Sequence, residues 1–240
     1  MKRVSAVLSV VLMCTRTSAQ ENANTLFVKA VEKCWGNELD SAVFYLQMSF
    51  EKGYQHPSEV LSQKAFRPLR NDADRRWKLN RMLRQHAVES EVTIVDEREK
   101  GDRLTINGSI LDSEGNPVRD AIFYLYQTDN QGLYAPENLR PGFGSNNPRL
   151  FGYCRTDTNG QFTAHTIRPG SYIGTRSLRH VHFEITAPAG CDAVSEFILD
   201  KDPVPTENQV RDAHKRKFPI LPAYHDGRGK LVVDFVWTCK

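Results

Sequence analysis

The chain has 240 residues, with 32 basic and 29 acidic side chains and a formal net charge of +3 at pH 7. This length suits one mid-sized domain with an extension, or two small domains, and it allows a substantial hydrophobic core. The near balance of charges argues against nucleic acid or an anionic membrane as the main partner.

The first 19 residues have the three-part plan of a secretory signal peptide. A basic start precedes an apolar stretch over residues 4–13, and small residues follow up to Ala19. The stretch is about half of the roughly 20 residues that a membrane-spanning helix needs, and no later segment is apolar for that long. We therefore expect an exported protein, secreted or periplasmic, without a membrane span. A lipid anchor at Cys14 is a less favoured alternative, because Met13 before it is larger than lipoprotein processing usually accepts.

Four cysteines follow the predicted cleavage site: Cys34, Cys154, Cys191 and Cys239. In an oxidising compartment this even number predicts one or two disulfides, whose pairing the sequence leaves open. None of the four has CxxC spacing, so neither a zinc site nor a thioredoxin-like redox role is expected.

Residues 20–95 form a first region with helical periodicity. Phe27, Ala30, Val31 and Cys34 fall at i, i+3, i+4 and i+7, which places them on one helix face. Similar spacing and start signals further on predict three or four short helices, among them one that begins at Asp72. The region loosely resembles a single tetratricopeptide-type repeat unit.

A basic run lies near the end of this helical region. We interpret it as a solvated helix face and not as a partner surface, because Asp72 and Asp74 dilute its charge. Its members are Arg67, Arg70, Arg75, Arg76, Lys78, Arg81 and Arg84.

Residues 96–240 show short alternating runs separated by turn residues. Such a pattern predicts a mainly β fold, an antiparallel β-sandwich preceded by the small α-helical region. The two longest connections, 136–148 and 203–229, are where we expect a binding mouth. The predicted strands are 104–111, 121–126, 150–156, 161–167, 181–186, 194–199 and 231–237.

Two histidines and two tyrosines are the candidate metal ligands. His180 and His182 stand two apart on a predicted strand, so both imidazoles point to one face while Val181 points to the other. Tyr134 and Tyr172 each come just after a turn at a strand end, where side chains of different strands converge. Singly, each residue is more often found without a metal, and the four together carry the prediction.

The motifs around these residues resemble the intradiol ring-cleavage dioxygenase family, which includes the protocatechuate and catechol dioxygenases. The resemblance covers about residues 104–203, under half of the chain, and leaves out the helical region. It is carried by Gly108-x-Ile110-Leu111-Asp112-x-x-Gly115-x-Pro117-Val118, Tyr126-Gln127-x-Asp129-x-x-Gly132-x-Tyr134, Thr156-Asp157-x-x-Gly160-x-Phe162-x-x-x-Thr166-Ile167-x-Pro169-Gly170-x-Tyr172 and His180-Val181-His182-Phe183.

The resemblance implies a non-haem Fe(III) enzyme. Its partners would be a small aromatic diol of the catechol type and O₂, and the ring would open between the two hydroxyl-bearing carbons to give a muconate-type diacid. Tyr134 and Tyr172 are implied as tyrosinate ligands and His180 and His182 as imidazole ligands, with Tyr172 also acting as a catalytic base. Phenolates are hard anionic donors that favour Fe(III), which agrees with this ligand set.

Two positions depart from the family pattern. Ser177 stands where the family has an arginine, and Glu196 stands where it often has a glutamine. Arg176 and Arg179 are the candidates for the missing catalytic cation. Strand alternation favours Arg176, because in an extended backbone it shares the face of His180.

The sequence is also compatible with a different class of function. A metal-free, transthyretin-like β-sandwich used for binding or adhesion would share the same turn pattern. The iron content of the protein distinguishes the two hypotheses.

Overall fold

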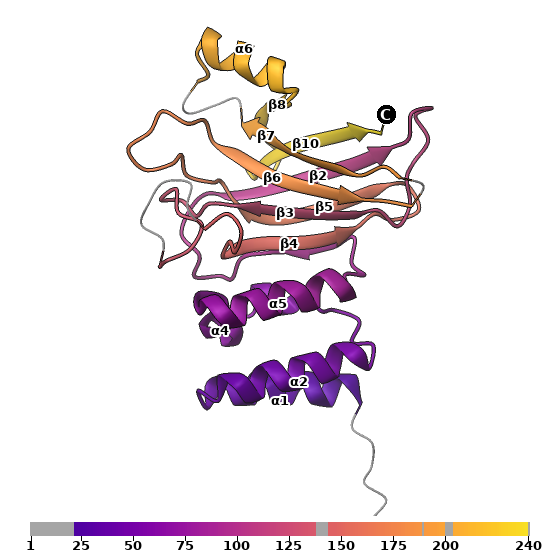
Figure 1. Ribbon diagram of the computed structural model, residues 1–240, viewed down its shortest axis with the longest axis vertical. Coiled ribbons are helices and arrows are strands. Elements are labelled where there is room, and N and C mark those ends of the chain that lie inside the picture. The colour runs from indigo at the N-terminus through magenta and orange to yellow at the C-terminus, as the bar shows by residue number, and fades with distance from the viewer. Residues whose placement is uncertain (1–21, 138–143, 189, 200–203, 240) are drawn as a thin grey trace, which may run out of the picture.

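The computed structural model describes residues 22–137, 144–188, 190–199 and 204–239. A layer of helices lies against two stacked β-sheets, and helix α6 (Glu207–Arg216) lies at the opposite end of the molecule (Figure 1). The described part of the chain is mainly β with a small helical region before it, as predicted. The predicted signal peptide, residues 1–19, lies outside the described residues.

The helical region contains more and shorter helices than predicted. Asp72 caps the last of them, because its side chain accepts a hydrogen bond of 2.9 Å from the backbone N–H of Arg75. Within the described residues the elements are α1 (Ala23–Trp35), α2 (Leu39–Glu51), α3 (Glu59–Ser62), the 3₁₀ turn η1 (Lys64–Phe66), α4 (Arg67–Asn71) and α5 (Ala73–His86).

The strands form two five-stranded sheets, in the orders β1-β5-β2-β10-β9 and β4-β3-β6-β7-β8. All predicted strands are present, with bounds that differ by at most one residue. The strands are β1 (Glu91–Thr93), β2 (Arg103–Leu111), β3 (Ile122–Gln127), β4 (Leu150–Arg155), β5 (Gln161–Ile167), β6 (His180–Thr186), β7 (Ala193–Leu199), β8 (Ile220–Leu221), β9 (Ala223–His225) and β10 (Leu231–Thr238).

The sandwich is mainly antiparallel, as predicted, and contains three parallel pairings among the described strands. β1 pairs with β5, β10 with β2 and β8 with β7, and all three pairs are parallel. Each pair joins strands that are distant along the chain or separated by a helix, so the chain can return in the same direction. β1 falls within residues 20–95, the range assigned to the helical region, and α6, β8 and β9 fall within the predicted connection 203–229.

Aromatic side chains fill the space between the two sheets. Phe123 of β3 stacks on Phe162 of β5 with ring centroids 4.2 Å apart, and Phe183 and Phe235 pack beside them. All four are buried. Burying one phenylalanine contributes about 1.5–3 kcal/mol, so this cluster is a main source of the attraction between the sheets.

Two arginines of the basic run are buried, so its interpretation as a solvated helix face is wrong for them. Arg70 is 3% exposed and its Nη2 lies 2.5 Å from Oδ2 of Asp96. Arg76 is fully buried, donates from Nε to the carbonyl of Asn147 at 3.0 Å, and pairs with Glu137. Burial lowers the pKa of Arg70 to about 10. These ion pairs attach the helical region to the sandwich, and compensate charges that would be costly if left alone.

One disulfide, between Cys191 and Cys239, confirms the prediction of at least one. It ties the segment before β7 to the end of β10, and thus one sheet to the other. Cys34 and Cys154 are buried free thiols. Over the described residues, no helix combines the length and the apolar character needed to cross a membrane.

Two glycines let the turn after β3 pack directly against the turn after β5. Gly132 has a φ of +84°, and a Cβ placed on it would lie 1.9 Å from the carbonyl oxygen of Ser171. Gly170 donates its N–H to the carbonyl of Asp129 at 2.7 Å, and its own Cβ would lie 2.4 Å from the nitrogen of Gly132. The backbones therefore touch, which draws the ends of the two strands together.

Gly132→Ala should separate these turns. The positive φ costs about 1–2 kcal/mol for alanine and the clash with backbone costs about 1–3 kcal/mol more, so we expect a loss of about 3 kcal/mol in the free energy of unfolding. Urea unfolding at 25 °C measures it. Gly115→Ala is the matched control, because Gly115 has a φ of +87° and nothing within 4 Å of its added Cβ. Equal losses in the two variants would show that the turn contact contributes nothing.

Candidate metal centre

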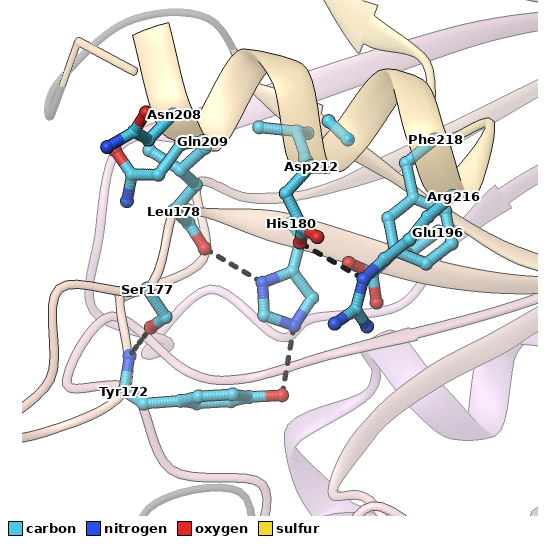
Figure 2. Close-up of a pocket in the computed structure, with 12 residues that line it drawn as sticks. Tyr172, Ser177, Leu178, His180, Glu196, Asn208, Gln209, Asp212, Arg216 and Phe218 are labelled. Carbon is cyan, nitrogen blue, oxygen red and sulfur yellow. Dashed lines mark hydrogen bonds and ion pairs between the residues drawn. The ribbon is translucent and has the colours of Figure 1, made fainter. Parts of the chain in front are cut away.

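The four residues predicted as ligands lie together at one end of the second sheet. Tyr134 follows β3, Tyr172 follows β5, and His180 and His182 lie in the first half of β6. The hydroxyl of Tyr172 lies 2.9 Å from Nε2 of His180 (Figure 2). The hydroxyl of Tyr134 lies 2.8 Å from that of Tyr172. The ring of His182 is centred 4.8 Å from that of His180 and 6.1 Å from that of Tyr134. The donors thus converge from three separate segments.

Alternation along β6 accounts for the placement of the two histidines. Val181 and Phe183 are fully buried and face the core between the sheets. His180 and His182 therefore face the outer side, where the turns that carry the tyrosines reach them. Tyr134 is 1% exposed, whereas Tyr172 is only partly buried and borders a cavity.

Burial sets the protonation states at this centre. It raises the pKa of Tyr134 well above its ordinary value, and the hydrogen bond with Tyr172 adds to this rise. Burial also raises the pKa of Tyr172. For His182, burial lowers the pKa to about 3, so the imidazole is neutral at pH 7 and keeps a lone pair. Without a cation the two phenols stay protonated.

The Nδ1 atom of each histidine faces an oxygen. His180 donates from Nδ1 to the carbonyl of Leu178 at 2.8 Å, which leaves Nε2 for Tyr172. Nδ1 of His182 lies 3.4 Å from Oε2 of Glu196, its cross-strand neighbour on β7. Tyr126 stacks on the ring of His182 with centroids 4.8 Å apart. A hydrogen bond therefore holds His180, while ring stacking and a nearby carboxylate restrain His182.

This donor set suits a trivalent cation. Two phenol oxygens and two imidazoles converge, and in the metal-free state the phenols and His180 satisfy one another by hydrogen bonds. Phenolate is a hard anionic donor, and a buried tyrosine becomes phenolate when a nearby cation supplies the compensating charge. Donor atoms of His180, His182 and Glu196 also lie within 4.8 Å of one another. The residues present fit Fe(III).

A cavity of about 400 Å³ opens beside this centre (Figure 2). Tyr172, His180 and Glu196 form its inner wall. Helix α6 forms the opposite wall, and the side chains of Leu178, Ile198 and Phe218 supply apolar surface. The predicted mouth in the connection 203–229 thus contributes through a helix that sequence reasoning missed.

The signal for α6 was present in the sequence. Thr206 and Gln209 form a capping box, in which the Thr206 hydroxyl accepts from the Gln209 N–H at 3.3 Å and the Gln209 side chain accepts from the Thr206 N–H at 2.9 Å. The helix brings Asn208, Asp212 and Arg216 to the cavity, residues that no sequence argument had singled out. Only one residue of α6, Ala213, is buried, which explains why the apolar pattern was too weak to predict the helix.

The two arginines predicted as catalytic do not line this cavity. Arg176 is exposed, and Arg179 donates from Nη1 to the carbonyl of Pro169 at 2.6 Å. The alternation argument that favoured Arg176 does not apply, because β6 begins at His180 and a turn at residues 173–175 precedes it. Arg216 is the arginine that borders the cavity among the described residues.

The known proteins that resemble this chain are dioxygenases. A family model described as dioxygenase matches residues 82–218. Hydroxyquinol 1,2-dioxygenase of Corynebacterium glutamicum is 28% identical over 122 residues, which cover 43% of this chain and 38% of that protein. The protocatechuate 3,4-dioxygenase beta chain of Burkholderia cepacia is 28% identical over 117 residues, which cover 43% of this chain and 47% of that protein. The chain thus spans less than half the length of either relative.

Solved structures resemble the chain more distantly. An intradiol ring-cleavage dioxygenase from Tetranychus urticae shares 19% identity with a TM-score of 0.48, over 64% of this chain and 87% of that one. The family model matches more than half of the residues, and the relatives named above are ring dioxygenases. The chain therefore belongs to the intradiol ring-cleavage dioxygenase family.

Proposed function

We propose that this protein is a non-haem Fe(III) dioxygenase that opens a catechol-type ring between its two hydroxyl-bearing carbons with O₂. The product would be a muconate-type diacid. The observation that carries the proposal is the chain of contacts from Tyr134 through Tyr172 to His180, with His182 beside it, at the wall of a cavity. Family membership supports the same reaction.

Tyr134, Tyr172, His180 and His182 would hold the iron. When bound, Fe(III) withdraws electron density from a coordinated aromatic diol, and so makes the ring reactive toward O₂. Tyr134 is buried and does not line the cavity, so it would hold the iron out of reach of a substrate. Tyr172 borders the cavity, so its Oη would be the donor atom open to an entering diol and could accept a proton from it.

The cavity suits a small aromatic ring. Its volume of about 400 Å³ lies in the lower part of the range of small-molecule sites, roughly 300–1,000 Å³. Leu178, Ile198 and Phe218 can exclude water from the faces of the ring while its hydroxyls point to Tyr172 and His180. The polar side chains of α6, namely Asn208, Gln209, Asp212 and Arg216, line the same cavity.

The first test is the colour and iron content of the purified protein. Tyrosinate-to-Fe(III) charge transfer should make it red-brown after expression in iron-replete medium, with about one iron per chain, and the visible band should shift when catechols are added. A colourless protein without stoichiometric iron would favour the metal-free sandwich hypothesis.

The two tyrosines provide controls within the same experiment. Tyr134→Phe removes a ligand that stays bound throughout, so iron retention should fall. Tyr172→Phe removes the ligand that borders the cavity, so iron should be retained better while turnover slows. Full activity in both variants would contradict the proposed ligand set.

We further propose that Arg216 supplies the cation that faces the bound diolate. Its Nε pairs with Asp212 at 3.0 Å, and its side chain lines the cavity (Figure 2). The side chain is 62% exposed, so water screens its charge, and Arg216→Ala should weaken catechol binding by about tenfold and not more. Lys215→Ala is the control, because Lys215 is an exposed cation of the same helix outside the cavity lining.

Catechol titration of the iron-loaded protein, followed by its visible spectrum, measures this effect. Arg176→Ala and Arg179→Ala belong in the same series, since the sequence had predicted those two residues. A larger loss of affinity in either of them than in Arg216→Ala would restore the original prediction.

Export is a separate proposal. The signal-peptide pattern of residues 1–19 supports it, and the Cys191–Cys239 disulfide is typical of proteins from an oxidising compartment. When the full chain is expressed in a secreting host, the mass of the exported protein should correspond to a start at Gln20. Accumulation inside the cell with Met1 or Lys2 retained would refute export.

A further inference from the structure

Glu196 lies beside His182, a proposed metal ligand, at the wall of the cavity. It is the direct cross-strand partner of His182 in the antiparallel pair of β6 and β7. Its Oε2 lies 3.4 Å from Nδ1 of His182, and the two side chains are 22% and 21% exposed. The family pattern often has a glutamine here, so the carboxylate is a property of this chain.

His180 shows what such a contact does. Its Nδ1 donates to the carbonyl of Leu178 at 2.8 Å, and as a result its Nε2 points to the hydroxyl of Tyr172 at 2.9 Å. One nitrogen is fixed by an acceptor and the other is presented to the cluster. A carboxylate at Nδ1 of His182 gives that ring the same arrangement, because a proton held on Nδ1 leaves the lone pair on Nε2.

Tyr126 fixes the plane of the same ring. It pairs with His182 across β3 and β6, and the two rings stack at an interplanar angle of 13°. Stacking restrains the tilt of the imidazole but does not choose which nitrogen carries the proton. An acceptor close to one nitrogen makes that choice, and Oε2 of Glu196 lies 3.4 Å from Nδ1 of His182.

We propose that Glu196 is a positioning residue for His182, whose carboxylate accepts the Nδ1–H and presents the Nε2 lone pair to the metal. The inference rests on the proposed iron centre. A carboxylate behind a ligating histidine also makes the imidazole a stronger donor, and loss of such a partner typically lowers metal affinity by roughly 10–100-fold.

The chain offers a matched control in Glu184. It lies on the same face of β6, two residues beyond His182, and both Glu184 and Glu196 act on Tyr126 through their charge. In the strand register Glu184 is opposite Tyr124 and Val194, so it does not share the cross-strand position of His182. Glu184→Gln therefore removes a nearby negative charge without removing the acceptor at Nδ1.

The first measurement uses the metal-free protein. Nitrogen-15 NMR of labelled histidines, with the His182 signals assigned by their loss in His182→Ala, reports which ring nitrogen is protonated. We expect the Nδ1–H tautomer in the wild type and in Glu184→Gln, and an exchanging mixture in Glu196→Ala. A wild-type His182 protonated on Nε2, or an unchanged tautomer in Glu196→Ala, would overturn the inference.

The second measurement is the Fe(III) affinity, by competition with a chelator of known strength. Glu196→Ala should bind roughly 10–100-fold more weakly, Glu196→Gln should fall in between because its amide oxygen still accepts, and Glu184→Gln should match the wild type. The charge-transfer band of Glu196→Ala should move to lower energy, since a weaker imidazole donor leaves the iron more electron-poor.

These readouts separate the inference from the proposed function. A wild-type protein that takes up no iron refutes the iron centre, while the NMR result still decides whether Glu196 selects the tautomer. A wild-type protein that binds iron, with equal affinity and band energy in Glu196→Ala, refutes the positioning role and leaves the iron centre intact.

Discussion

The structure depends on burying two phenols and two imidazoles at one point. Polar groups taken out of water need partners, and here Tyr134, Tyr172 and His180 provide them for one another. The same burial raises the pKa of both tyrosines and lowers that of His182. Both phenols and the His182 imidazole are thus neutral in the metal-free state, and a cation with a high charge can replace the tyrosine protons. For a cation to replace these protons, the donor atoms must already lie close together in the metal-free protein.

The helical region helps to keep them close, although it lies outside the segment that resembles the family. Arg76 of α5 reaches the carbonyl of Asn147 at 3.0 Å and pairs with Glu137, on either side of the undescribed residues 138–143. Arg149 donates its N–H to the carbonyl of Tyr134 at 2.6 Å, and its guanidinium pairs with Glu99. These buried ion pairs thus fix the segment that carries Tyr134. Removing one partner of a pair would leave a buried charge without compensation.

Sequence reasoning succeeded where local pattern decides structure. β5 was predicted with its observed bounds because Gln161–Ile167 alternates cleanly and follows a turn that ends in Gly160. β1 was missed, because three residues inside a charged segment become a strand only through pairing with β5. Burial of Arg70 and Arg76 was missed for a similar reason, since their partners Asp96 and Glu137 are far along the chain. The convergence of Tyr134 and Tyr172 was predicted by resemblance, and its cause, the contact of two glycine turns, is a tertiary feature.

The segment between Tyr172 and His180 contacts α6, the helix that brings the positive charge of Arg216 to the cavity. Where the family pattern has an arginine, this chain has Ser177, whose hydroxyl accepts the N–H of Tyr172 at 3.0 Å. The serine side chain is short enough to lie under the turn at residues 173–175 and to accept from the backbone of Tyr172, the proposed metal ligand. A long guanidinium side chain at this position would not make that contact. Gln209 holds α6 against the same segment by donating from Nε2 to the carbonyl of Arg176 at 2.7 Å. The backbone next to Ser177 thus anchors the helix that brings Arg216 to the cavity.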